Sequence, residues 1–116
     1  MIQLKRVYEQ SEETDGFRIL VDRIWPRGIS KERASLDLWL KEIGPTKELR
    51  QSFHSGQIDF ASFRKQYLLE LATEPQKEAL NQLAAIIKKE PVVTLVFAAK
   101  NSQENQAVVL KEVLSK

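Results

Sequence analysis

The most strand-like segment of the chain reads VVTLVFAA and runs from Val92 to Ala99. Every side chain in it except Thr94 is apolar, and such runs are typical of strands that are covered on both faces. Pro91 interrupts the helical pattern before this segment, and Lys100 ends the apolar run. The segment therefore predicts a central strand of a sheet with helices packed against it.

A second buried strand is predicted over Phe17–Trp25. Its residues 19–21 are consecutive and apolar, which again requires cover on both faces. Pro26 lacks a backbone N–H and Gly28 permits a positive φ, so this strand gives way to a loop. Over Ile2–Tyr8, apolar and polar residues alternate, which is typical of an edge strand.

Helical signals fill the rest of the chain, and because helices connect the second and third strands, those two strands should be parallel neighbours. The chain is therefore expected to be a single α/β domain over residues 1–116. Its sheet is expected to be small and mixed, with central parallel strands and about five helices covering it. Apolar spacing and capping residues place these helices at Leu36–Ile43, Thr46–Phe53, Asp59–Leu71, Thr73–Ile87 (with a capping box between Thr73 and Gln76) and Asn101–Leu114 (capped by Asn101).

Composition narrows the chemistry open to this chain. Among its 116 residues are no cysteine and one histidine, His54, so disulfides, thiolate or multi-histidine metal sites and cysteine nucleophiles are excluded. The formal net charge is +2, so anion affinity must come from a local cluster. No apolar stretch approaches the roughly 20 residues that span a bilayer, and the N-terminus lacks a signal-peptide core. We expect a cytoplasmic protein without membrane association, metal or cofactor.

The carboxyl ends of the two central strands should meet at one edge of the sheet, where α/β proteins usually bind ligands. Asp22 lies at the end of the first of these strands, and a carboxylate is costly to bury there unless it is paired. Two interpretations stay open: a general base or ligand-orienting acid, or half of a structural ion pair. The candidate partners are Arg18, Arg23 and Arg27.

Basic residues are concentrated around the loop that follows Asp22. Arg27 beside Gly28 combines a planar guanidinium with open backbone, an arrangement suited to a phosphate or a carboxylate. Arg33 is expected to be solvated instead. The sequence therefore predicts an anion contact at Arg27.

Lys100 precedes the expected start of the final helix at Asn101. The free N–H groups at a helix N-terminus favour an anion, and the lysine would reinforce them. Asn105 and Gln106 add neutral donors one turn further on. We therefore expect an anion to bind between the loop at residues 26–28 and this helix start.

The sequence indicates a functional role less clearly for the aromatic residues and the single histidine than for Asp22 and the basic residues. Trp25 is either a wall of the core or a surface on which a base or sugar stacks. Trp39 is expected in the core, and Tyr67 is expected to pack with its apolar neighbours. His54 is a candidate general acid or base, although no fixed partner for it is visible in the sequence.

The string Asp-Arg-x-Trp-Pro-Arg-Gly at residues 22–28 resembles the signature of the YeaO-like branch of the domain-of-unknown-function family numbered 488. Many members of the broader family carry a cysteine near the end of the last strand and a Cys-His-Arg string soon after. Residues 97–100 and 104–106 hold neither here, so thiol chemistry or metal binding does not transfer. The resemblance covers nearly the whole chain and includes LDLWLKE at 36–42, ELR at 48–50, FH at 53–54, FRKQY at 63–67, FAAKN at 97–101 and NQA at 105–107.

Three functions are compatible with these residues. The first is a small enzyme acting on a phosphate-bearing or nucleotide-like substrate, with Asp22 and His54 as catalytic candidates. The second is a non-catalytic module that binds a nucleotide, a nucleic acid or an acidic partner, and the third is a structural protein. A concave pocket lined by Asp22 favours the first, a flat basic face the second, and full pairing of Asp22 with arginines the third. The ligand-binding candidates are Arg23, Trp25, Arg27, Gly28, Lys100, Asn101 and Asn105.

Overall fold

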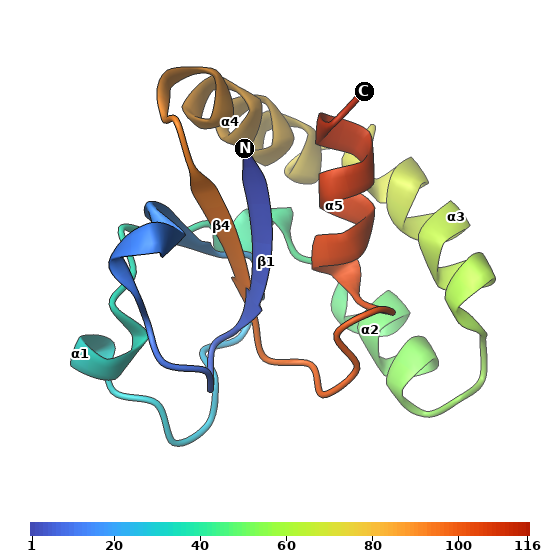
Figure 1. Ribbon diagram of the computed structural model, residues 1–116. Coiled ribbons are helices and arrows are strands. Elements are labelled where there is room, and N and C mark those ends of the chain that lie inside the picture. Colours follow the sequence, from blue (N-terminus) through green and yellow to red (C-terminus); the bar gives the residue numbers. More distant parts are fainter.

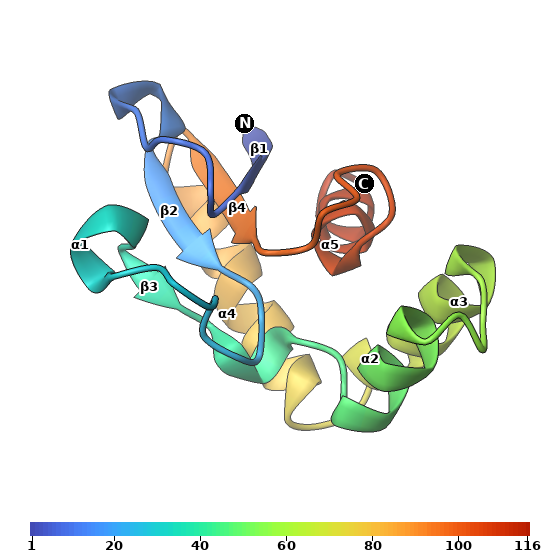
Figure 2. The same ribbon diagram turned by 90° about the horizontal axis from the view of Figure 1, so that it is seen from below.

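The computed structural model describes all 116 residues and contains one four-stranded sheet. Its strands are β1 (Ile2–Arg6), β2 (Phe17–Leu20), β3 (Leu38–Trp39) and β4 (Val93–Phe97), in the order β1-β4-β2-β3 (Figures 1 and 2). All three neighbouring pairs are parallel. The predicted α/β class, the edge position of β1 and the parallel pairing of β2 with β4 are confirmed. The sheet is parallel throughout rather than mixed, because every strand is reached by a crossover and none by a hairpin.

Five α-helices accompany the sheet: α1 (Lys31–Ala34), α2 (Lys47–His54), α3 (Phe60–Leu71), α4 (Gln76–Lys89) and α5 (Gln106–Leu114). Two short 3-10 turns, η1 (Glu13–Asp15) and η2 (Lys41–Ile43), complete the elements. Figure 2 shows α1 on one side of the sheet and α2 to α5 on the other. None of the helices combines the length and apolar composition that crossing a bilayer requires.

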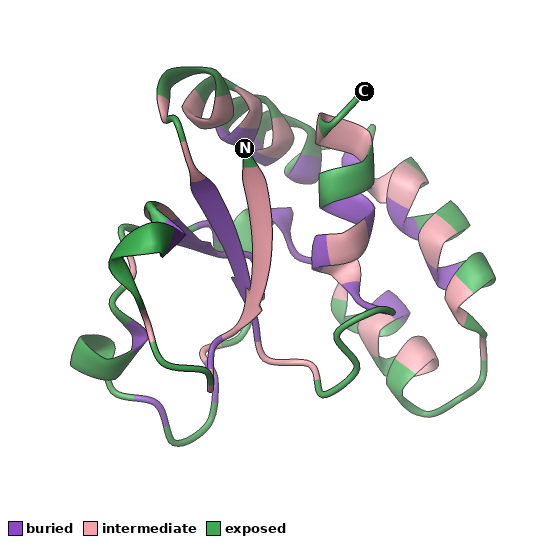
Figure 3. Ribbon diagram, in the orientation of Figure 1, coloured by how far each residue is buried: buried purple, intermediate pink, exposed green.

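The central strands are covered on both faces, as their sequences predict. All five residues of β4 are buried, and they form the purple central arrow of Figure 3. Alternate side chains of the sheet, such as Ile19 and Leu95, join a core of 16 buried residues with α2 to α5. Leu20 and Val96 point the other way and pack with a smaller cluster that includes Ala34 of α1. Helices α2 to α5 therefore cover one face of the sheet, and α1 with its flanking loops covers the other.

A buried ion pair at the amino end of β2 was not predicted. Arg18 is 3% exposed and Asp15 is 4% exposed, and Nη1 of Arg18 lies 2.5 Å from Oδ2 of Asp15. The Arg18 guanidinium also donates to the carbonyls of Ala34 and Ser35. Arg18 is therefore not the partner of Asp22 that the sequence allowed, because it lies at the opposite end of the strand.

The prediction of a helix over Leu36–Ile43 is wrong, because this segment contains β3 and η2 instead. The backbone N–H of Asp37 donates to Arg18 and that of Leu40 donates to Leu20, so the middle of this segment pairs with β2 as β3. An apolar spacing of three and four residues also fits a two-residue strand followed by a 3-10 turn. Trp39 is consequently 37% exposed rather than part of the core.

The predicted helix starts have a mixed outcome. Thr46 caps α2 and Asp59 caps α3 through their side chains, as expected. The capping box of Thr73 does not form, since its hydroxyl donates back to Leu69 of the preceding helix. The last helix begins with Asn105 as its cap rather than Asn101, so the loop after β4 is longer than the sequence suggested.

Candidate functional site

A cavity of about 680 Å³ opens at the carboxyl ends of β2 and β4. Three segments that are distant in the sequence bound it: the loop after β2, the loop from β4 into α5, and helix α2, which lie together at the lower side of Figure 1. Aromatic side chains of Trp25, Phe53 and Phe63 contribute to its wall. This is the strand edge at which the sequence placed a ligand site.

Asp22 lines the cavity and is half-buried. Its Oδ2 accepts a hydrogen bond from the backbone N–H of Ala98 at 3.0 Å, and its Oδ1 accepts one from the side-chain amide of Gln106. None of the ion pairs of the protein includes Asp22. Burial raises the pKa of Asp22 from 3.8 to about 6, although the two hydrogen bonds and the charge of Arg50 act to lower it.

Arg50 of α2 also lines the cavity. Its guanidinium donates to no residue of the protein, and its Nε is buried without any hydrogen-bond partner. The position follows from the helix: buried Leu49 faces the core, and Arg50 lies one turn before His54 on the neighbouring side. A buried N–H that lacks an acceptor is unusual in folded proteins, so Arg50 differs from the structurally engaged Arg18 and Arg23.

The other predicted residues around Asp22 differ in their availability. Arg23 lines the cavity, but its guanidinium donates to the carbonyls of Gly44 and Pro45 at 2.9 and 3.0 Å and holds that turn in place. The indole N–H of Trp25 donates to the carbonyl of Ile29, and its ring contributes to the wall. His54 lines the cavity from the end of α2, is exposed and makes no hydrogen bond through its side chain.

Arg27 and Lys100 approach the cavity from different loops. Both line it, both are exposed, and neither side chain is in an ion pair. Gly28 has φ 77° and open space around its α-carbon, but it is not part of the lining. The two cations are therefore available to an anion, whereas Gly28 serves to turn the loop.

Asn101 and Asn105 line the cavity, and both side chains hold local structure. Oδ1 of Asn101 accepts from the backbone of Gln103 and Glu104. Asn105 is 2% exposed, and its Oδ1 accepts from the backbone of Val108 at the start of α5. Gln106, the next residue, is the amide that reaches Asp22.

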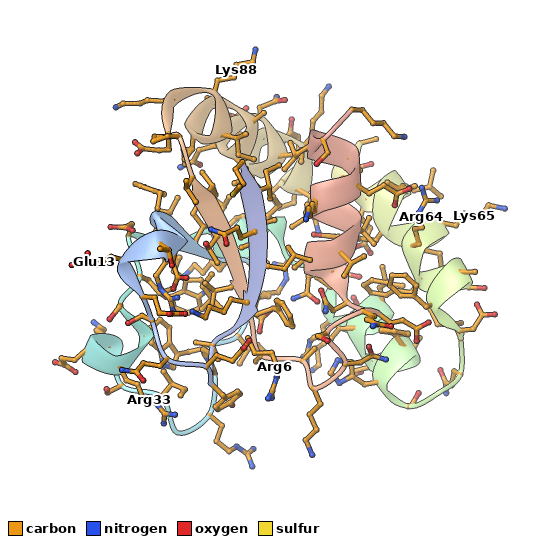
Figure 4. The ribbon with its side chains drawn as sticks, in the orientation of Figure 1. Arg6, Glu13, Arg33, Arg64, Lys65 and Lys88 are labelled. Atoms are coloured by element: carbon orange, nitrogen blue, oxygen red, sulfur yellow. The ribbon has the colours of Figure 1, made fainter.

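Sequence reasoning missed one residue that lines the cavity, Arg50, and one outside the lining that holds a bounding loop, Arg6. Arg50 lies in the ELR string that resembles the family, and a helical projection would have placed it beside His54. Arg6 donates to the carbonyls of Ala99 and Ala98 at 2.8 and 3.3 Å and ties the loop after β4 to the end of β1. In Figure 4 it is labelled below the sheet, next to this loop. Nothing local in the sequence connects it to residues more than 90 positions away.

The cavity has a positive balance of charge. Four basic residues line it, namely Arg23, Arg27, Arg50 and Lys100, against two acidic ones, Asp22 and Glu104. No group of three or more His, Asp and Glu side chains lies close enough together to hold a metal ion. Chemically, the site can hold an anion and can exchange a proton at Asp22.

This arrangement defines an α/β protein with a cavity of positive charge balance at the carboxyl ends of parallel strands. By sequence the chain belongs to the domain-of-unknown-function family 488, because the family model described as "Inactive DUF488-N3 subclade" matches residues 1–116. It is 53% identical over 113 residues to the "Uncharacterized protein YeaO" of Escherichia coli, covering 97% of this chain and 96% of that protein. It is 36% identical over 114 residues to the "Uncharacterized protein Rv3073c" of Mycobacterium tuberculosis, covering 98% and 93%. No solved structure matches the chain significantly.

Proposed function

We propose that the protein is a non-catalytic module that binds a small phosphate-bearing ligand, such as a mononucleotide, in the cavity at the strand ends. The observation that carries this proposal is the guanidinium of Arg50, which lines the cavity and has a buried N–H without an acceptor. Leaving such a group unpaired costs about 1–3 kcal/mol. The guanidinium of Arg50 donates to no other residue, so a phosphate oxygen in the cavity would give it an acceptor, and Arg27 and Lys100 would approach the other oxygens.

The shape and lining of the cavity favour a small molecule over a flat nucleic-acid surface. Its volume of about 680 Å³ falls within the range usual for small-ligand pockets. Trp25, Phe53 and Phe63 supply apolar wall against which a base or sugar would pack. The cations and the aromatic wall together match a ligand with one charged and one planar part.

Catalysis is the second candidate. Asp22, with a pKa raised to about 6 by burial, has the acidity of a general acid or base and lines a concave cavity. Against it stands the description of the matching subclade as inactive. Binding without turnover is therefore the function we favour.

Titration with nucleoside monophosphates, followed by NMR amide shifts, tests the proposal. Shifts should cluster at residues 22–27, 50–54 and 98–106 and should weaken with added salt. Arg50→Gln should weaken binding about tenfold or more, because it removes a charge-assisted hydrogen bond. Arg64→Gln is the matched control, since it removes the same charge from an exposed pair with Glu112 outside the cavity (Figure 4).

Two results would contradict parts of the proposal. Absence of shifts at millimolar nucleotide and millimolar phosphate would remove the binding function. Release of nucleoside, or of any other product during the titration, would replace binding without turnover by the catalytic candidate.

A further inference from the structure

We infer that Asp22 makes this cavity selective for oxyanions that carry a proton, such as hydrogen phosphate, over oxyanions that carry none, such as sulfate. The inference rests on the proposed function, because it concerns which anion the same cavity accepts. The charged side chains that line the cavity are mostly cationic, yet one of them is the carboxylate of Asp22. That carboxylate is not neutralised by any cation in hydrogen-bond contact.

The hydrogen bonds of Asp22 leave it able to accept more. Its Oδ2 accepts from the backbone of Ala98 at 3.0 Å and its Oδ1 accepts from the amide of Gln106. Each oxygen of an ionised carboxylate has two lone pairs, so each can still accept one further donor. Both present donors are neutral, so no hydrogen-bonded cation offsets the negative charge of Asp22.

Arg50 supplies the opposite requirement. Its charge acts on Asp22 without forming a direct ion pair, and its guanidinium has no acceptor. A group that joins the two must offer oxygens to Arg50 and a proton to Asp22. Hydrogen phosphate does both, since its P–O⁻ oxygens accept from Arg50 and its P–OH donates to the carboxylate.

Sulfate meets only one of these requirements. At neutral pH it has no proton to donate, so an oxygen placed near Asp22 would face an ionised carboxylate and be repelled. The other charged or titratable groups around Asp22 do not separate hydrogen phosphate from sulfate by its proton. None of them is a carboxylate that two neutral donors hold in place. These groups are Arg23, Arg27, Arg50, His54, Tyr67, Lys100 and Glu104.

The experiment compares the affinities of inorganic phosphate and sulfate for the full chain at about pH 8, where Asp22 is ionised. The native protein should bind phosphate about tenfold or more tightly than sulfate, the effect of one hydrogen bond to a charged group. Asp22→Asn should abolish the preference by strengthening sulfate binding, because the amide donates where the carboxylate repels. Glu13→Gln, which removes an exposed charge far from the cavity, should keep the preference.

Asp22→Ser gives a second variant without the carboxylate, and thermal melting verifies that each variant is folded. Equal binding of the two anions by the native protein, or a preference that survives in both Asp22 variants, would overturn the selectivity while leaving the proposed function intact. Binding of neither anion would overturn the selectivity, and the proposed function would fall with it if millimolar nucleotide also gave no amide shifts.

Discussion

Asp15 and Asp22 lie beyond opposite ends of β2 and have opposite surroundings. Asp15, before the strand, accepts from Arg18 at 2.5 Å, from Lys5 at 3.1 Å and from the backbone of Glu12 at 3.0 Å. Asp22, after the strand, accepts only from a backbone N–H and a neutral amide. The two arginines differ in the same way, because Arg18 is fully engaged and Arg50 is not.

The pKa values of Asp15 and Asp22 shift in opposite directions. Burial by itself would raise the pKa of Asp15, but the hydrogen bonds from Glu12, Lys5 and Arg18 outweigh it and lower the value. For Asp22 burial dominates, and the pKa rises to about 6. Asp15 is paired directly with Lys5 and Arg18, whereas Asp22 lies near Arg50 without forming an ion pair with it. Asp15 and Arg18 at the amino end of β2 therefore stabilise the fold, whereas Asp22 and Arg50 at the carboxyl end are not paired with an opposite charge.

The largest expected effect comes from breaking the amino-end pair. Asp15→Ala should lower the free energy of unfolding by about 3–5 kcal/mol, because it leaves the buried charge of Arg18 without its partner. Urea unfolding at neutral pH measures the change. Glu13→Ala in the same turn is the control and should change stability by less than about 0.5 kcal/mol, since Glu13 is exposed. A loss below about 1 kcal/mol for Asp15→Ala would show that the pair is not structural.

The next effect distinguishes the two aspartates by pH. Asp22 has a higher pKa in the folded chain than in the unfolded one, so the folded state holds the extra proton between about pH 4 and pH 6. Stability from this group should therefore fall as the pH rises through that window, by up to about 3 kcal/mol. Asp15 acts in the opposite sense: its contribution is present above its unfolded pKa and is lost as the pH falls below about 4.

Urea unfolding of the native chain and of Asp22→Asn between about pH 4 and pH 7 checks this. The variant should gain stability relative to the native chain as the pH rises, and the difference should level off above about pH 7. If Asp22 were half of an ion pair, which is one of the two interpretations of the sequence, its variants would lose stability through an orphaned arginine. That expectation changes because no arginine pairs with this carboxylate. A difference that does not vary with pH would mean that Asp22 titrates like an exposed aspartate.

Much of the fold could be predicted because it depends on apolar runs. The consecutive apolar residues in β2 and β4 indicated central parallel strands, and Thr46 and Asp59 marked two helix starts. β3 was missed because a two-residue edge strand has too little pattern to outweigh a helical spacing. Thr73 was misassigned because a capping motif is a local signal, and the preceding helix offered its hydroxyl another acceptor.

The candidate site was located more readily than it was described. Strand ends and basic residues pointed to the edge of the sheet at which the cavity opens, and Asp22, Arg27 and Lys100 line that cavity. Whether a charged side chain is paired depends on contacts across the sequence, such as Arg23 with Gly44. Local sequence carries no record of these contacts. The same limit concealed Arg50, whose lack of a partner becomes visible only when the whole chain is folded.

The smallest effect concerns Asn101 and Asn105, which line the cavity at the carboxyl ends of the strands. Their side chains hold local structure, so we predict that they contribute to stability rather than to ligand binding. Asn105→Ala should lower the free energy of unfolding by about 1 kcal/mol, because Asn105 caps α5. Asn101→Ala should cost less than about 0.5 kcal/mol, since Asn101 is exposed and closes only a local turn. Thermal or urea unfolding measures both changes, and phosphate affinity should stay within about twofold in each variant, because Arg50 and Asp22 are untouched. A greater loss of stability for Asn101→Ala would return the helix start to the position that the sequence suggested. A large loss of phosphate affinity in Asn105→Ala, with stability unchanged, would show that Asn105 contacts the ligand. The binding site would then include the start of α5.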